Sequence, residues 1–284
     1  MTSVTVRGVV INHEIVGTRG PGMALTPGGR NPLGHVRSMA ERMAAAGYRV
    51  LIHDRRNCGG SDVAFDPSQS EYDVSADDLH ALLAHYDLLP AVVGGASSGA
   101  RLSLAFALRH PAAVRALLLW RVTGGRFAVD RLVEKYYDEY VRAAEQGGMA
   151  AVAATEHFAE VIRNRPSNHE RLLALDPREF VAVMQAWRAH FVASADWPLI
   201  GVSERDLRAI RAPALIVPGD DLTHGEETGT NAARLIPDCE LSVMTSGTRN
   251  IEMADLAEWD AREHAMAALF DDFLARRLAL RRVG

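Results

Sequence analysis

Strand-like apolar runs alternate with helix-like segments along most of this chain. Strand composition marks residues 3–17, and buried-type strands are expected at 48–54, 91–97 and 114–122. Apolar residues at helical spacing predict helices at 35–47, 73–86 and 98–110, with Asp73 as a cap. Such alternation is typical of a parallel sheet covered by helices on both faces.

The alternation stops after Val122 and resumes at residue 213. Between these points, residues 124 to about 211 show one helical pattern after another. From 213 the chain again shows strands, in "PALIVPGDD" and "CELSVMTSG", and then a terminal helix over 257–280. We therefore expect an α/β core in two parts, 1–123 and 212–284, split by a helical cap insertion at 124–211 that forms a lid or pocket wall.

Composition narrows the class of protein further. The 284 residues are 48% hydrophobic with a net charge of −5, which favours neither nucleic acid nor an anionic membrane as a partner. No apolar run reaches the roughly 20 residues of a membrane span, and no signal peptide is expected at the N-terminus. Cys58 and Cys239 show no metal-like spacing, so we expect reduced thiols in a cytoplasmic protein without metal or cofactor.

The stretch "VVGGASSGAR", residues 92–101, has two interpretations. It is similar to the glycine turn of short-chain dehydrogenases, which binds a dinucleotide. Against that interpretation, two strand–helix units precede it, Gly99 is followed by Ala100 and Arg101 instead of the last fingerprint glycine, and no Tyr-x-x-x-Lys motif is present.

The second interpretation is a nucleophile elbow, because residues 95–99 read G-x-S-x-G between a buried strand and a helix. A serine in such a tight turn needs very small neighbours on both sides. The N–H of Ser98 would then point at the substrate oxygen, helped by the positive end of the helix. The same five-residue pattern also occurs in ordinary Gly/Ser turns. The surrounding sequence must therefore distinguish a nucleophile elbow from such a turn.

That context resembles the α/β-hydrolase superfamily over nearly the whole chain. "LTPGGRNP" is similar to its oxyanion turn, "YRVLIHDRRNCGGSD" to its D-x-R-G-x-G-x-S loop, "GGASSGARLSLAFALRHP" to its elbow and central helix, and "APALIVPGDD" to the strand before its acid. The resemblance implies an α/β-hydrolase fold, with a mostly parallel sheet flanked by helices and an inserted helical cap.

The resemblance also implies site residues. Ser97 matches the nucleophile, Asp221 matches the acid with Asp220 as an alternative register, and N–H groups of Ser98 and of Gly29 or Arg30 match the oxyanion donors. The family's histidine belongs in the loop after the last strand, where this chain has Arg249. Arginine cannot act as a base, because its guanidinium stays protonated at neutral pH.

Another histidine could supply the base, and His224 is the first candidate because it lies three residues after Asp221. The remaining histidines are expected to be surface or packing residues. Arg249 would either pair with Asp221 or, together with Arg30, bind an anionic group of the substrate. Cys58 lies in a loop near the site and is expected to be a spectator.

Two hypotheses about function remain open. The first is a hydrolase that acts through Ser97 on a small ester, lactone or related carbonyl compound under the cap, with an atypical or missing base. The second is a non-hydrolytic protein of the same fold, such as a lyase, an isomerase or a ligand binder, in which Arg249 holds an anion. Both imply a small-molecule partner, and the mixed cap helices are also compatible with a homodimer.

Overall fold

The computed structural model describes residues 2–278, and its centre is one eight-stranded sheet. The strands lie in the order β1-β2-β4-β3-β5-β6-β7-β8. Pairs from β4 to β8 are parallel, whereas β2 is antiparallel to both of its neighbours. The strand bounds are β1 Thr2–Val6, β2 Val9–Val16, β3 Gly22–Thr26, β4 Arg49–His53, β5 Ala91–Ala96, β6 Val114–Trp120, β7 Ala214–Val217 and β8 Cys239–Leu241.

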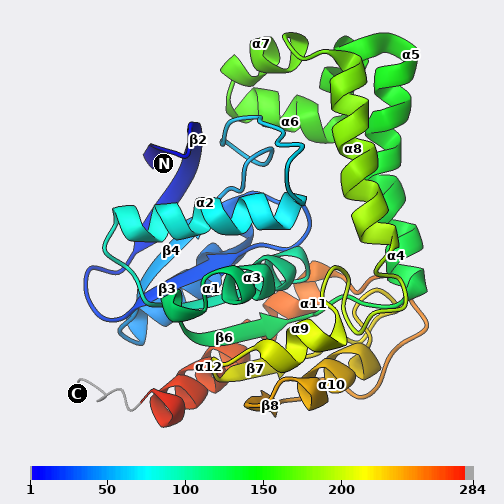
Figure 1. The fold of residues 1–284 in the computed structure, drawn as a ribbon. Helices are drawn as coiled ribbons and strands as arrows, with labels where there is room; N and C mark the ends of the chain where they lie inside the picture. Colours follow the sequence, from blue (N-terminus) through cyan, green and yellow to red (C-terminus); the bar gives the residue numbers. More distant parts are fainter. Residues whose placement is uncertain (1, 279–284) are drawn as a thin grey trace.

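Helices cover both faces of this sheet (Figure 1). One face packs against side chains such as Leu79, Phe106 and Leu207, and the other against side chains such as Met43 and Phe270. The helices of the first face are α2 Glu71–His85, α3 Ser98–Arg109, α9 Glu204–Ala209 and α10 Glu226–Leu235. The helices of the second face are α1 Arg37–Ala45, α11 Leu256–Asp260 and α12 Glu263–Arg277. Short 3-10 turns, η1 Leu33–Val36 and η2 Pro111–Ala113, precede α1 and β6.

A second group of helices stands to one side of the sheet, with α5 and α8 running alongside each other (Figure 1). It has its own apolar core, which includes Phe158, Met184 and Trp187. Its bounds are α4 Arg126–Val133, the π-helical turn η3 Glu134–Asp138, α5 Glu139–Ala154, α6 Glu156–Asn164, α7 Ser167–Leu173 and α8 Pro177–Val192. These helices lie within the segment expected to form a cap. The following helix, α9, packs instead with the sheet core through Leu207.

The register of the parallel strands places four chain segments side by side at the carboxyl ends of the central strands. Thr26 pairs with Gly95, Ala96 with Trp120, and Trp120 with Val217. The segments that leave these strands therefore start next to one another. They include the turn after β3, the residue after β5, the residue after β6 and the loop after β7.

Several local details differ from the sequence-based expectations. Residues 3–17 form a hairpin of two strands, because Arg7 and Gly8 both adopt positive φ and turn the chain. Helix α2 begins at Glu71, since Ser70 accepts the Asp73 N–H as its N-cap. The terminal helix is broken into α11 and α12, and its expected last residues, 279–280, lie outside the described part.

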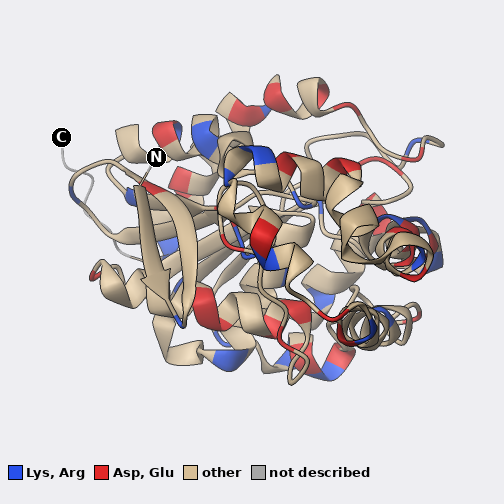
Figure 2. Cartoon of the chain, turned by 90° about the horizontal axis from the view of Figure 1, so that it is seen from above, with Lys and Arg blue, Asp and Glu red and all other residues tan. Residues whose placement is uncertain are grey.

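Charge is dispersed over the molecule. Seen from above, basic and acidic segments intermingle on the helices and loops (Figure 2). In the range 2–278, no helix is both long and apolar enough to cross a membrane.

Candidate active site

Ser97 stands at the sharp turn between β5 and α3. Its backbone has φ 52° and ψ −110°, a left-handed conformation that is unfavourable for a residue with a side chain. A Cβ atom on Gly95 would lie 2.5 Å from the Thr26 carbonyl oxygen, and one on Gly99 would lie 2.1 Å from it. Only glycine at both positions lets this turn close against β3, as the elbow interpretation requires.

His224 is the hydrogen-bond partner of the Ser97 hydroxyl. Its Nε2 atom lies 3.0 Å from Ser97 Oγ, and its Nδ1 atom lies 2.9 Å from Asp221 Oδ1. With the Nδ1 proton donated to the carboxylate, Nε2 is left to accept the serine proton. Ser97 is half-buried, whereas His224 and Asp221 are buried. The structure thus brings three of the sequence-predicted residues into one hydrogen-bonded chain.

Asp221 is held by backbone donors from two loops. Its Oδ1 accepts the N–H groups of Thr223 and His224 at 3.0 and 2.8 Å, and its Oδ2 accepts that of Ala254 at 2.8 Å. The two loops are joined by further bonds, such as the Leu222 N–H to the Ile251 carbonyl at 2.9 Å. Both carboxylate oxygens therefore have fixed directions, and so does the imidazole that Asp221 holds.

The local electrostatics favours an ionised Asp221 and a neutral His224, the state in which the imidazole can accept a proton. Burial raises the pKa of Asp221, but the hydrogen bond and charge of His224, the Ala254 N–H and the Arg121 guanidinium outweigh it and bring that pKa well below its usual range. Burial lowers the pKa of His224, against the opposing effect of the Asp221 hydrogen bond. At neutral pH Asp221 is therefore ionised and His224 is neutral.

The turn after β3 lies directly beside the elbow. A Cβ on Gly28 would be 3.3 Å from Ser97 Cβ, and Gly29 follows with φ 57°. The buried Arg55 guanidinium donates a hydrogen bond to the Gly29 carbonyl oxygen. The Ser98 N–H is in the first turn of α3, where N–H groups have no intrahelical acceptor. The turn that carries Gly29 and the helix start that carries Ser98 thus both lie beside the serine.

Two side chains of the π-helical turn η3 reach this region. The Tyr136 hydroxyl lies 3.4 Å from Ser98 Oγ, and the Tyr137 hydroxyl donates to Glu71 at 3.0 Å. Arg30 has an almost buried side chain, pairs with Glu71 at 3.4 Å and donates to the Tyr136 carbonyl at 3.0 Å. Arg30 therefore joins the turn after β3 to η3 and to the start of α2.

Arg249 does not contact Asp221 in the way that one sequence interpretation expected. Its guanidinium lies 2.9 Å from Asp220 and 3.0 Å from Glu258, and its side chain is 38% exposed. Its N–H donates to the Asp220 carbonyl at 2.7 Å, which keeps its backbone near the site while the side chain turns to the surface. The residue beside Asp221 is instead Arg121, whose guanidinium lies 3.3 Å from Oδ2.

The two thiols are free, and burial raises the pKa of Cys58 to about 11. Cys58 is therefore protonated at neutral pH, as a spectator would be. Within the described range, no three His, Cys, Asp or Glu side chains are grouped so as to hold a metal ion.

Two residues that contact Asp221, Arg121 and Ala254, were not predicted from the sequence. Arg121 directly follows the buried strand β6, and a charged residue at the carboxyl end of a strand was a usable signal. Ala254 acts through its backbone N–H, to which no side-chain pattern points.

Comparisons with known proteins give a family match. Residues 25–168, which include the elbow, match the model of a family described as alpha/beta hydrolase fold. The chain is 28% identical over 217 residues to the non-heme chloroperoxidase CPO-A1 of Kitasatospora aureofaciens, covering 73% of this chain and 77% of that protein.

Solved structures agree on the fold. A hydrolase from Pseudomonas aeruginosa PA01 superposes with a TM-score of 0.64 at 19% identity, covering 98% of each chain. The enol-lactonase from Burkholderia xenovorans LB400 superposes with a TM-score of 0.62 at 18% identity, covering 96% of this chain and 100% of that one.

Proposed function

Because the chain belongs to the alpha/beta hydrolase fold family, we propose that it is a serine hydrolase that cleaves a small ester, lactone or related carbonyl compound. The observation that carries this proposal is the hydrogen-bonded chain from Ser97 through His224 to Asp221. A hydroxyl, a neutral imidazole and a buried carboxylate in this order are the parts of nucleophilic acyl transfer.

In the first half of the reaction, Ser97 Oγ attacks the substrate carbonyl carbon while His224 Nε2 takes the hydroxyl proton. Asp221 stabilises the imidazolium that forms. The carbonyl oxygen becomes an oxyanion, which accepts hydrogen bonds from the N–H groups of Ser98 and Gly29. The tetrahedral intermediate then expels the alkoxide, which receives the proton from His224, and an acyl-serine remains.

In the second half, His224 takes a proton from a water molecule, whose oxygen attacks the acyl carbon. The intermediate releases Ser97 as the leaving group, and His224 returns the proton to its Oγ atom. The products are a carboxylic acid and an alcohol, or one hydroxy acid from a lactone. Each proton passes through Nε2, so the 3.0 Å contact with Ser97 is used in both halves.

The non-hydrolytic alternative depended on Arg249 as the holder of an anion. Its guanidinium already has a carboxylate on either side, from Asp220 and Glu258, and that does not support such a role. The atypical origin of the base does not weaken the hydrolase proposal, because His224 makes the two hydrogen bonds that a general base needs.

A fluorophosphonate probe tests the proposal, since it modifies a serine only when a base activates it. Peptide mass spectrometry of the treated protein should find the adduct on Ser97. Ser97→Ala should abolish labelling, and the matched variant Ser68→Ala, at an exposed serine, should label like the wild type. A folded wild-type protein that stays unlabelled, or that is labelled elsewhere, would refute the proposal.

A further inference from the structure

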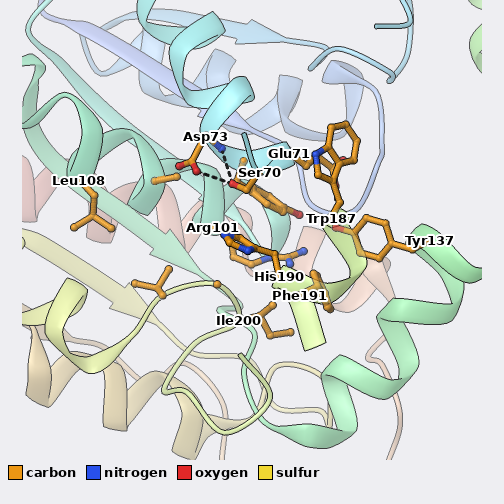
Figure 3. A pocket seen from close by; sticks show the side chains of 14 residues that line it. Ser70, Glu71, Asp73, Arg101, Leu108, Tyr137, Trp187, His190, Phe191 and Ile200 are labelled. Atoms are coloured by element: carbon orange, nitrogen blue, oxygen red, sulfur yellow. Dashed lines mark hydrogen bonds between the residues drawn. The ribbon is translucent and has the colours of Figure 1, made fainter. Parts of the chain in front are cut away.

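A cavity lies between the elbow helix and the cap, next to the catalytic centre proposed above. It has a volume of about 120 Å³. Figure 3 shows the Arg101 side chain in the middle of its lining, with residues from the start of α2 on one side and Phe191 and Ile200 on the other. Ser97 does not line this cavity, but Arg101 is only one helical turn further along α3.

Arg101 is a buried cation with unused donors. The residue is 3% exposed, and its Nη2 atom donates to Ser98 Oγ at 2.8 Å. Its Nε and Nη1 atoms have no hydrogen-bond acceptor, and no carboxylate pairs with it anywhere in residues 2–278. The rings of Tyr72 and Phe191, with centroids 4.5 and 4.9 Å from Cζ, supply only a partial substitute for a counter-ion.

The acidic residues of the lining are already engaged. Glu71 lies 3.4 Å from Arg30 and accepts the Tyr137 hydroxyl. Asp73 accepts the Ser70 hydroxyl and lies 3.7 Å from Arg109 on the outer part of α3. Arg101 therefore brings a positive charge into the cavity that no neighbouring carboxylate neutralises. An unpaired buried charge is costly, and a bound anion would offset that cost.

The rest of the lining indicates what the anion is attached to. Apolar and aromatic side chains dominate it, among them Leu108, Trp187, Phe191 and Ile200. An engineered apolar cavity of about 150 Å³ takes one benzene molecule, so this space suits a single ring or a short alkyl chain. Planar guanidinium groups bind carboxylates through two parallel hydrogen bonds.

We propose that this cavity binds a small carboxylic acid with an apolar body, its carboxylate accepting from Nη1 of Arg101 and from the second N–H of Nη2, which is not the one given to Ser98. Such binding does not depend on hydrolysis. The carboxylate belongs either to the substrate or to a separate small acid. The first option rests on the proposed function. In either case the same guanidinium donates to the Oγ atom of Ser98, whose N–H is a proposed oxyanion donor.

Isothermal titration with benzoate, and with benzamide as its neutral counterpart, tests the site. Wild-type protein should bind benzoate, and benzamide about tenfold or more weakly, because it lacks the charge. Arg101→Gln should reduce benzoate affinity about 10- to 100-fold and leave that for benzamide nearly unchanged. The matched variant Arg208→Gln, at an exposed arginine outside the lining, should bind benzoate like the wild type.

Equal affinities for benzoate and benzamide in the wild type would overturn the proposal, even if Arg101→Gln does not fold. So would unchanged benzoate affinity in a folded Arg101→Gln protein. The titration is repeated with Ser97→Ala, in which binding should persist. A protein that the fluorophosphonate does not label can therefore still bind benzoate, and the two proposals fail separately.

The source of the carboxylate is then decided by kinetics with a 4-nitrophenyl ester that carries a free carboxylate. Competitive inhibition by benzoate, together with loss of the preference for this ester over its neutral methyl ester in Arg101→Gln, assigns the group to the substrate. A rate change by benzoate without competition assigns it to a separate acid. Both outcomes retain the site on Arg101.

Discussion

His224 Nε2 lies 3.0 Å from the Ser97 hydroxyl oxygen, although 127 residues separate the two in the chain. The same histidine is only three residues from Asp221, to which its Nδ1 is bonded. The proposed acid and base therefore lie in a single loop after β7, and the loop after β8 contributes the Ala254 N–H that donates to Asp221.

His224→Gln should lower kcat/KM for a 4-nitrophenyl ester on the order of 10⁴- to 10⁶-fold, because it removes the group that we propose takes the serine proton. The ester assay measures this directly, with circular dichroism to show an intact fold. His264→Gln, on α12, is the matched control and should retain wild-type activity. Activity within tenfold of wild type in His224→Gln would exclude His224 as the base.

Asp221→Asn should lower kcat by about 10⁴-fold, because the amide no longer stabilises the imidazolium or fixes its tautomer. Asp220→Asn is the matched control. Asp220 pairs with Arg249 and not with His224, so its loss should change kcat only a few-fold. The reverse order of the two effects would show that Asp220 is the acid.

The activity should rise with pH as His224 loses its proton. Because burial lowers the pKa of His224, the midpoint of kcat/KM against pH should lie below the ordinary histidine value of about 6.5. The imidazole is protonated and inactive below that midpoint and free to accept a proton above it. A pH profile of kcat/KM for the wild type checks this, and a midpoint above 7 contradicts it.

Gly219→Ala should displace the base without removing any catalytic group. The added Cβ would lie 2.5 Å from His224 Cβ and 2.5 Å from its carbonyl oxygen. A shift of about 1 Å in a reacting group costs roughly 100-fold in rate, so kcat should fall by about that factor. Gly34→Ala, where an added Cβ has nothing within 4 Å, should have wild-type kinetics. Equal kinetics of the two variants would mean that the loop adjusts freely.

Arg249→Gln should leave kcat/KM within about threefold of wild type, since this guanidinium pairs with Asp220 and Glu258 and not with Asp221 or His224. The ratio of kcat/KM for anionic and neutral esters should also stay the same. A selective loss for the anionic ester would restore the hypothesis that Arg249 binds a charged group of the substrate.

Sequence periodicity predicted the core of the fold because buried strands and amphipathic helices have local signatures. The segments around β4, β5 and β6 were recognised in this way, and family comparison confirms the α/β-hydrolase fold. The boundaries of strands and helices were predicted less accurately where a single residue sets them. The positive φ of Arg7 splits the first strand region, and Ser70 caps α2 in place of Asp73.

The tight turn at Ser97 could also be predicted from the sequence, because the G-x-S-x-G pattern reflects a local steric requirement for glycine on both sides of the serine. The geometry at Gly95 and Gly99 shows that requirement in the form of close contacts with Thr26. The identity of the base was not readable in the same way. Counting along the loop after β8 pointed to Arg249, whose backbone does approach Asp220 but whose side chain turns outward.

The sequence by itself determined the sheet, its helical layers and the sharp turn at Ser97, since each depends on residues that are neighbours in the chain. Only the tertiary structure decided that His224 meets Ser97 and that Arg101 is left without a counter-ion. Both facts depend on how irregular loops and the helices between β6 and β7 pack against the carboxyl ends of the strands. Such packing is set by long-range contacts, such as the bond from Leu222 to Ile251, for which no local periodicity exists.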